Sequence, residues 1–191
     1  MPSFPELRTD RLHLRAFTPS DGSRVEQLAG AREVADTTLT IPHPYPNGAG
    51  ASWIATHGEA WTRASSLAMA ICHSDFHDGL IGAISLAVNK AHRHGELGYW
   101  IGVPWWGLGY ATEAARALTA YGFTELGLHR IHGRHFTRNP ASGRVLQKLG
   151  MRLEGVQRDA FLRWDRFEDV AMYSILEADW LTRPADLDPV T

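Results

Sequence analysis

The chain has 191 residues, of which 21 are acidic and 19 are basic, so its formal net charge is −2. This length corresponds to one domain, and the charge balance argues against an obligate nucleic-acid-binding protein, which usually has a basic surplus. The single cysteine excludes an intramolecular disulfide framework and a zinc site of several cysteines, and it suits a reducing compartment. Neither a membrane-spanning run of about 20 apolar residues nor a signal peptide is visible. We therefore expect one cytoplasmic domain over residues 1–181, a disordered tail over 182–191, and no membrane or nucleic-acid partner.

Hydrophobic periodicity predicts a mixed α/β chain. Alternating apolar and polar residues predict a strand at Arg11–Phe17, and three prolines with two glycines make Thr40–Gly50 a loop. A helix start at Thr18–Asp21 precedes that loop. The further expected helices are Ala51–Ala64, Ala111–Leu126 and a short one from Asn139 to Gly150, and the further expected strands are Ser66–Cys72, Leu80–Val88, Gly95–Ile101, Arg130–Thr137, Glu154–Phe161 and Asp169–Leu176. The order predicts hairpins together with a crossover helix.

A glycine-bearing loop connects the strand ending at Ile101 to the longest helix. A helix N-terminus presents unpaired N–H groups and partial positive charge, and Gly107 and Gly109 would let a phosphate approach those groups closely. The alternative is a glycine-containing turn before an alanine-rich core helix. A dinucleotide fingerprint would need a glycine where Thr112 stands, and the lysine of a P-loop is absent. The pattern thus indicates a pyrophosphate site of neither standard nucleotide type.

This loop resembles the acyl-CoA loop, [QR]-x-x-G-x-[GA], of the GNAT superfamily of N-acetyltransferases. It reads Trp106-Gly-Leu-Gly-Tyr-Ala111 here, and Trp106 in place of Gln or Arg is typical of the branch that resembles the ribosomal-protein acetyltransferases RimJ and RimL. Asn139–Met151 is similar to the N-x-x-S-x-x-x-L-x-K-L-G-[FM] block of that branch, and Leu7–Arg15 and Pro42–Tyr45 are similar to two further blocks. The resemblance spans roughly Leu7 to Leu176, with its blocks in family order.

The resemblance implies a GNAT fold: a mixed, mostly antiparallel sheet of about seven strands, splayed in the middle and flanked by about four helices. It implies transfer of an acetyl group from acetyl-CoA to a primary amine, by direct attack and without a metal. The N-terminal α-amino group of a protein or peptide is the acceptor that the branch favours. The alternatives are a small-molecule amine or antibiotic acetyltransferase, an enzyme that uses succinyl-CoA, and a non-catalytic acyl-CoA-binding module. The resemblance makes a homodimer plausible.

The same resemblance assigns cofactor-binding residues. The pantetheine arm would bind the backbone of Ile101 and Val103, and Asn139 would hold the cofactor. The pyrophosphate would bind the segment composed of Gly107, Leu108, Gly109, Tyr110, Ala111 and Thr112. Arg144 and Lys148, one helical turn apart, could meet the 3′-phosphate, although such a pair is more often a solvated helix face.

Two residues are the candidates for catalysis. Glu96 matches the glutamate that the branch carries on the corresponding strand and would be the general base. Otherwise Glu96 is a strand carboxylate that faces solvent or pairs with Arg93. Ser142 would lie near the CoA sulfur and supply a proton or hydrogen bond, although Asn139 and Ser142 could also serve only to cap a helix. Tyr173 is a further candidate proton donor, or else a buried core tyrosine.

Three histidines spaced by three, His129, His132 and His135, would suggest metal ligands on a helix. This stretch is predicted to be a strand, on which His132 faces opposite to the other two. We therefore expect no metal site.

Overall fold

A single eight-stranded sheet organises the computed structural model, which describes residues 4–75 and 79–182. In sheet order the strands are β1 (Leu7–Arg8), β2 (Leu12–Arg15), β3 (Ser66–His73), β4 (Leu80–Asn89), β5 (His94–Ile101), β6 (Arg130–Phe136), β8 (Arg166–Leu176) and β7 (Arg152–Arg163). All neighbours are antiparallel except β5 and β6, which are parallel. The mixed, mostly antiparallel sheet is confirmed, with eight strands instead of about seven.

Seven α-helices lie within the described residues, instead of about four. They are α1 (Gly22–Ala29), α2 (Arg32–Asp36), α3 (Ala49–Ala55), α4 (His57–Thr62), α5 (Tyr110–Thr124), α6 (Pro140–Lys148) and α7 (Glu177–Thr182), with 3₁₀ turns η1 (Pro19–Asp21) and η2 (Val103–Trp105). The expected helix Ala51–Ala64 is wrong as one element. The amide of Thr56 bonds to Trp53 O, three residues back, so the α-helical ladder breaks there and two short helices result.

Two apolar clusters mark the two faces of the sheet. On one face, Leu118 of α5 and Leu146 of α6 pack with Leu97 and Ile131 of the sheet. On the other face, Val25 of α1 and Ile54 of α3 pack with Ala70 and Leu80, and Trp100 joins them at the edge. We refer to these faces as the α5–α6 side and the α1–α3 side.

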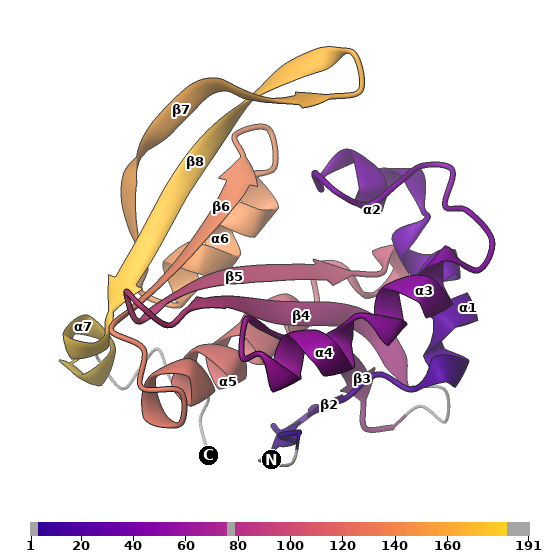
Figure 1. Cartoon of the computed structure of the whole chain (residues 1–191). Helices are drawn as coiled ribbons and strands as arrows, with labels where there is room; N and C mark the ends of the chain where they lie inside the picture. The colour runs from indigo at the N-terminus through magenta and orange to yellow at the C-terminus, as the bar shows by residue number, and fades with distance from the viewer. Residues whose placement is uncertain (1–3, 76–78, 183–191) are drawn as a thin grey trace.

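The sheet opens between β5 and β6. The two strands pair only from His94↔Arg130 to Leu97↔Gly133. Beyond that point β5 stays with β4 as far as Ile101, and β6 stays with β8 as far as Phe136. Figure 1 shows β6 diverging from β5 towards the long β7–β8 hairpin. The splay predicted from the resemblance is therefore present, and it leaves a gap in the middle of the sheet.

The C-terminal segment and the helix lengths complete the description. Thr182, the first residue of the predicted tail, is the last residue of α7, and the rest of that tail lies outside the described residues. Within 4–75 and 79–182, no helix has both the length and the apolar character that a membrane crossing requires.

Candidate active site

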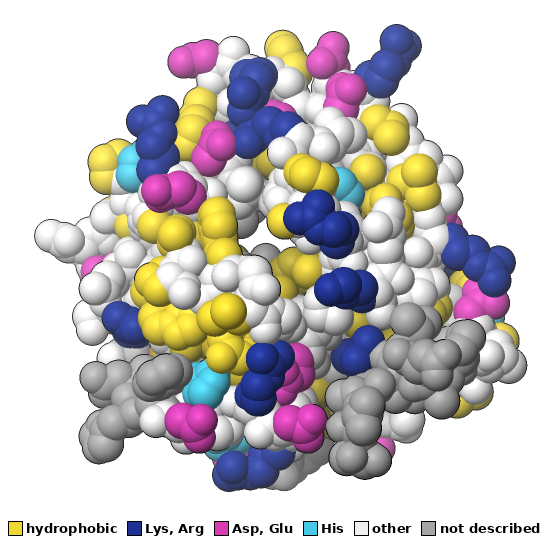
Figure 2. All heavy atoms as spheres, turned by 180° about the vertical axis from the view of Figure 1, so that it is seen from behind, with side chains coloured by type: hydrophobic (Ala, Val, Ile, Leu, Met, Phe, Trp, Pro, Cys, Tyr) yellow, Lys and Arg dark blue, Asp and Glu magenta, His cyan; other side chains and the backbone are white. Residues whose placement is uncertain are grey.

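A cavity of about 1060 Å³ occupies the gap between β5 and β6 and reaches both faces of the sheet. Its lining on the α5–α6 side comes from the glycine loop, α5 and α6, and its lining on the α1–α3 side comes from α1, α2 and the loop before α3. Figure 2, which shows the molecule from behind, has a hollow near the centre with Lys and Arg side chains beside it. Eight of the expected cofactor-binding residues line the cavity: Ile101, Gly107, Gly109, Tyr110, Ala111, Thr112, Asn139 and Ser142.

The glycine loop leads the chain into α5 with a left-handed backbone. Gly107 has φ +78° and Gly109, the N-cap of α5, has φ +86°, conformations that L side chains rarely adopt. A Cβ on Gly107 would meet nothing within 4 Å, so its place lies in open space at the cavity. The first amides of this 15-residue helix have no intrahelical acceptor. This end of the cavity therefore suits an anionic group.

Side chains from the N-terminal segment hold this loop and the first turn of α5. Arg11 donates to Leu108 O at 3.0 Å and forms an ion pair with Glu113 at 2.6 Å. Thr9 Oγ1 also donates to Glu113, at 2.6 Å. Burial alone would raise the pKa of the Glu113 carboxyl, but the bonds from Thr9 and Arg11 outweigh it and hold the pKa below its usual value. The Leu7–Arg15 block that the resemblance singled out thus supports the glycine loop.

The free edge of β5 faces the gap. Gly102 N bonds to Ile81 O, and the alternation of an antiparallel pair then turns the N–H and C=O of Ile101 away from β4. The indole of Trp106 donates to Ile101 O at 2.6 Å, which ties the loop back to the strand. Val103 is expected to bind the pantetheine arm together with Ile101, but of the two only Ile101 lines the cavity. The strand ends at Ile101, and Val103 begins a 3₁₀ turn with Pro104 and lies outside the cavity lining.

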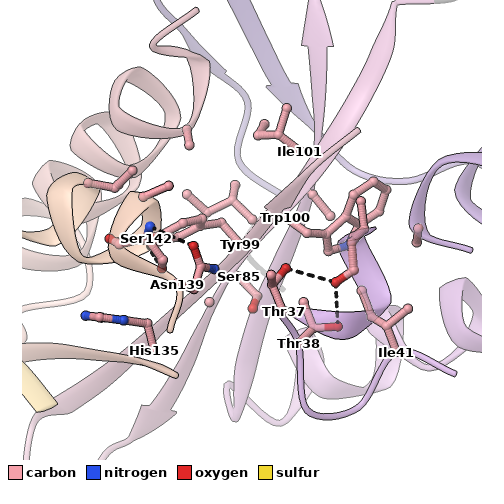
Figure 3. A pocket seen from close by; sticks show the side chains of 18 of the residues that line it. Thr37, Thr38, Ile41, Ser85, Tyr99, Trp100, Ile101, His135, Asn139 and Ser142 are labelled. Atoms are coloured by element: carbon pink, nitrogen blue, oxygen red, sulfur yellow. Dashed lines mark hydrogen bonds between the residues drawn. The ribbon is translucent and has the colours of Figure 1, made fainter. Parts of the chain in front are cut away.

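Ser142 and Tyr99 form a hydrogen-bonded pair on the α5–α6 side. The hydroxyl of Tyr99 lies 2.9 Å from Ser142 Oγ and donates to Ser142 O at 3.0 Å. Burial raises the pKa of Tyr99 to about 12, with the Ser142 bond opposing it, so the phenol is protonated at neutral pH. Asn139 Oδ1 accepts from Ser142 N at 3.3 Å, which confirms the predicted cap. Figure 3 shows Asn139 and Ser142 together beside Tyr99 at the cavity.

Other candidates on this side fall into two groups. Arg144 and Lys148 line the cavity, where an anionic ligand could meet them. Tyr173 and Leu108 do not line it. Tyr173 is buried and its hydroxyl accepts from Gln147 at 3.2 Å, which is the core alternative for this residue. The side chain of Leu108 is exposed, and its carbonyl is taken by Arg11.

Glu96 lies on the opposite face of the sheet from Ser142. Strand alternation places Glu96 with Gly98 and Trp100 on the α1–α3 side, whereas Tyr99 faces α6. The Glu96 carboxylate pairs with Arg134 of β6 at 2.8 Å, and not with Arg93, the partner that the alternative to a catalytic role would have given it. Arg93 instead donates to Gly127 O. Glu96 and Ser142 thus reach one cavity from its two sides.

The wall on the α1–α3 side is apolar and hydroxyl-bearing. Thr37, Thr38 and Ile41 form its outer edge, and Figure 3 shows them across the cavity from Asn139 and Ser142. Aromatic residues Tyr45, Trp53, Trp100, Phe136 and Phe161 complete it. Among the described residues that line the whole cavity, Glu96 is the only carboxylate.

Sequence reasoning missed Tyr99 and Arg134. Tyr99 could have been found, because it alternates with Leu97 and Ile101 on one face of a predicted strand. Arg134 could not, because its meeting with Glu96 depends on the register of the parallel β5–β6 pair.

Comparison with known proteins identifies the family. A model of the acetyltransferase (GNAT) domain matches residues 11–152. The uncharacterized N-acetyltransferase YoaA of Bacillus subtilis (strain 168) is 33% identical over 175 residues, which cover 91% of this chain and 98% of YoaA. The chain belongs to the GNAT acetyltransferase family. It is an N-acetyltransferase, and its relatives place it near the RimJ/RimL-like branch.

Two further GNAT proteins are similar to this chain, one in sequence and one in fold. The ribosomal protein uS5-alanine N-acetyltransferase of Escherichia coli (strain K12) is 33% identical over 183 residues, 91% of this chain and 92% of that protein. A structure of RimL, a ribosomal L7/L12 alpha-N-protein acetyltransferase, in complex with coenzyme A has a TM-score of 0.81 at 18% identity, covering 90% of this chain and 98% of that one. The second match shows the fold alone.

Acetyl-CoA is the acyl donor of this GNAT enzyme, and the residues of the cavity fit it. The left-handed glycines and the first turn of α5 suit its pyrophosphate, and Arg144 and Lys148 suit a further phosphate. No group of three or more His, Cys, Asp or Glu side chains that could hold a metal occurs in the described part of the chain.

Proposed function

We propose that this GNAT enzyme transfers the acetyl group of acetyl-CoA to the N-terminal α-amino group of a protein or peptide. One observation carries the proposal. Glu96 on the α1–α3 side and the Ser142–Tyr99 pair on the α5–α6 side line the same cavity through the gap between β5 and β6. An amine entering on one side and a thioester entering on the other would meet at this gap. Direct attack within a ternary complex requires such an arrangement.

The proposed roles follow from the proton balance. The amine nitrogen forms a bond to the carbonyl carbon, the carbon–sulfur bond breaks, the nitrogen loses a proton and the thiolate gains one. Glu96 lies where the proton leaves, and its side chain is 35% exposed, so a water molecule can relay the transfer. Ser142, bonded to the protonated Tyr99, lies on the side where the thiolate forms. Arg134 holds Glu96 in place through Oε1.

The charges of the cavity favour a singly charged acceptor. An α-amino group with a pKa near 8 is ~10% neutral at pH 7, whereas a lysine is ~0.04% neutral, so the α-amine needs less help from a base. A polyamine would bring a second or third ammonium group, and the described cavity lining has no carboxylate besides Glu96, which Arg134 already engages. An amine attached to an apolar residue, such as an N-terminal alanine, suits the threonine and aromatic wall.

A substrate panel tests the acceptor. Thiol release from acetyl-CoA would be followed with a lysine-free peptide that begins with alanine, the same peptide with a blocked N-terminus, a blocked peptide that contains lysine, and spermidine. We expect turnover with the first peptide alone. Turnover with spermidine or a small amine and none with the free N-terminus would replace this proposal by the small-molecule alternative. Binding of acetyl-CoA without turnover of any amine would favour the non-catalytic module.

The Ser142–Tyr99 pair provides a separate prediction. Replacing Ser142 by alanine should lower kcat about tenfold, because the leaving thiolate loses its hydrogen-bond partner, while the Asn139 cap to the backbone N–H of residue 142 stays. Tyr99→Phe should lower kcat less. If the two act as one relay, the double variant should be no slower than Ser142→Ala alone. Steady-state kinetics would measure this, with Ser52→Ala on α3 as the control. Additive effects of the two changes would contradict the relay.

A further inference from the structure

Arg163, the last residue of β7, is a buried cation that donates hydrogen bonds to a loop distant in sequence. Only 8% of the residue is exposed. Its guanidinium donates to the carbonyls of Ala35 and Ile41 at 2.6 Å each and to the carbonyl of Leu39 at 3.2 Å. Hydrogen bonds from a charged donor are the stronger class, and a planar guanidinium can serve several carbonyls at once.

The segment whose carbonyls Arg163 binds forms a wall of the cavity. Residues 37–42 connect the end of α2 to the loop before α3, and all six line the cavity on the α1–α3 side. Thr37 and Thr38 bond back to carbonyls of α2, which fixes the first part of the segment. Leu39 and Ile41 lie beyond this support, and Arg163 binds both of their carbonyls.

The hydrogen bonds of Arg163 are part of a wider contact between α2 and the β7–β8 hairpin. Arg138 forms ion pairs with Asp36 of α2 at 2.7 Å and with Glu168 of β8 at 2.9 Å. Arg32 of α2 lies over the ring of Trp164, 5.6 Å from its centroid. Figure 1 shows the turn of this hairpin on the same side of the molecule as α2. The two arms of the splayed sheet are thus joined above the α1–α3 side of the cavity.

We propose that Arg163 is a positioning residue for the amine acceptor: by holding the carbonyls of Leu39 and Ile41, it sets the shape of the wall against which the acceptor binds. This inference rests on the proposed function, which assigns the α1–α3 side of the cavity to the amine. Arg163 does not line the cavity itself. Its effect should therefore be confined to acceptor binding and leave acetyl-CoA binding at the glycine loop unchanged.

Steady-state kinetics of Arg163→Met and Arg163→Lys would test the proposal. For Arg163→Met we expect the KM of the acceptor to rise about tenfold, while the KM of acetyl-CoA and the kcat at saturating amine change less than about twofold. Arg163→Lys keeps the charge but cannot reach three carbonyls together, so its acceptor KM should lie between those of the wild type and Arg163→Met. Arg158→Met, an exposed arginine on the same strand, is the matched control. The lysine variant alone carries the test if the methionine variant fails to fold.

A purely structural Arg163 would give a different result. The melting temperature would fall, and the acceptor KM would stay at the wild-type value, which would overturn the inference. Gly98→Val distinguishes this outcome from failure of the proposed function. Gly98 lines the cavity on the α1–α3 side, and a Cβ there would meet only Ser85 Oγ, at 3.2 Å. A valine would therefore narrow that side of the cavity without involving Arg163. A raised acceptor KM in Gly98→Val, with none in the Arg163 variants, would refute the role of Arg163 alone. Unchanged acceptor KM in all of these variants would refute the assignment of that side to the amine.

Discussion

Replacing Glu96 by glutamine is expected to lower kcat about a hundredfold while the KM of acetyl-CoA stays unchanged. General-base catalysis contributes typically about 10²–10⁴-fold, and the proposed α-amino acceptor, which is already partly neutral, would place this enzyme near the lower end. Glutamine has almost the size of glutamate, so the packing around Glu96 is kept. What is lost is the proposed general base, which would take the proton of the amine directly or through water. Stopped-flow or steady-state assays of thiol release would measure the effect.

The pH profile sharpens this prediction. As the pH rises from 7 to 9, an α-amine with a pKa near 8 changes from ~10% to ~90% neutral. The amine then needs less help, so the deficit of the Glu96→Gln variant should shrink as the pH rises. A deficit that stays constant across this range would mean that Glu96 does not deprotonate the ammonium form of the amine and accepts only the proton that the nitrogen loses as the amide forms.

A paired control separates catalysis from ion pairing. Glu96 is bonded to Arg134, so glutamine also weakens that contact. Glu59 forms an ion pair with Arg63 on the exposed surface of α4, away from the cavity lining. Glu59→Gln should leave kcat unchanged because Glu59 lies away from the cavity. It should also leave stability almost unchanged, because exposed ion pairs contribute little to it. If Arg134→Met lowers kcat as much as Glu96→Gln, holding the carboxylate in place matters as much as its presence.

Elements with strong local signals were predictable from the sequence. The expected helix Ala111–Leu126 is α5 at Tyr110–Thr124, because an alanine-rich run of helix formers precedes Gly127, whose left-handed backbone ends the helix. The strand expected at Gly95–Ile101 is β5 with one more residue at its start. The final hairpin lies where the sequence predicts it but is longer than expected, since β7 continues to Arg163. Its exposed residues lack the alternation that would have marked its ends.

Contacts that depend on how distant segments meet were not predictable. The glycine loop and the Asn139 cap are local patterns, and both lie where expected. The pairing of Glu96 with Arg134 depends on a parallel register between strands that are about thirty residues apart in sequence, separated by a crossover helix. Likewise, Arg163 meets Leu39 only because the hairpin folds back over α2. The family resemblance predicts the gap in the sheet, but the residues that line its α1–α3 side are known only from the structure.

Replacing Gly107 by valine is expected to weaken acetyl-CoA binding about a hundredfold. Its φ of +78° strains any residue with a Cβ, and the added side chain projects into open space at the cavity, where it would keep the pyrophosphate from the loop amides. Losing one or two hydrogen bonds to a charged group, at about 1.5–3 kcal/mol each, accounts for this magnitude. Calorimetry with acetyl-CoA would measure the dissociation constant directly.

Gly127 offers a closely matched control for this prediction. It lies just beyond the other end of α5 with φ +59°, and a Cβ there also meets nothing within 4 Å. Gly127→Val should therefore lose a similar amount of stability, about 1–3 kcal/mol, and bind acetyl-CoA as the wild type does. At a concentration 100 times the wild-type Kd, acetyl-CoA should stabilise Gly127→Val by about 2.7 kcal/mol and Gly107→Val by only about 0.4 kcal/mol. Equal stabilisation of the two variants would mean that the glycine loop does not bind the pyrophosphate.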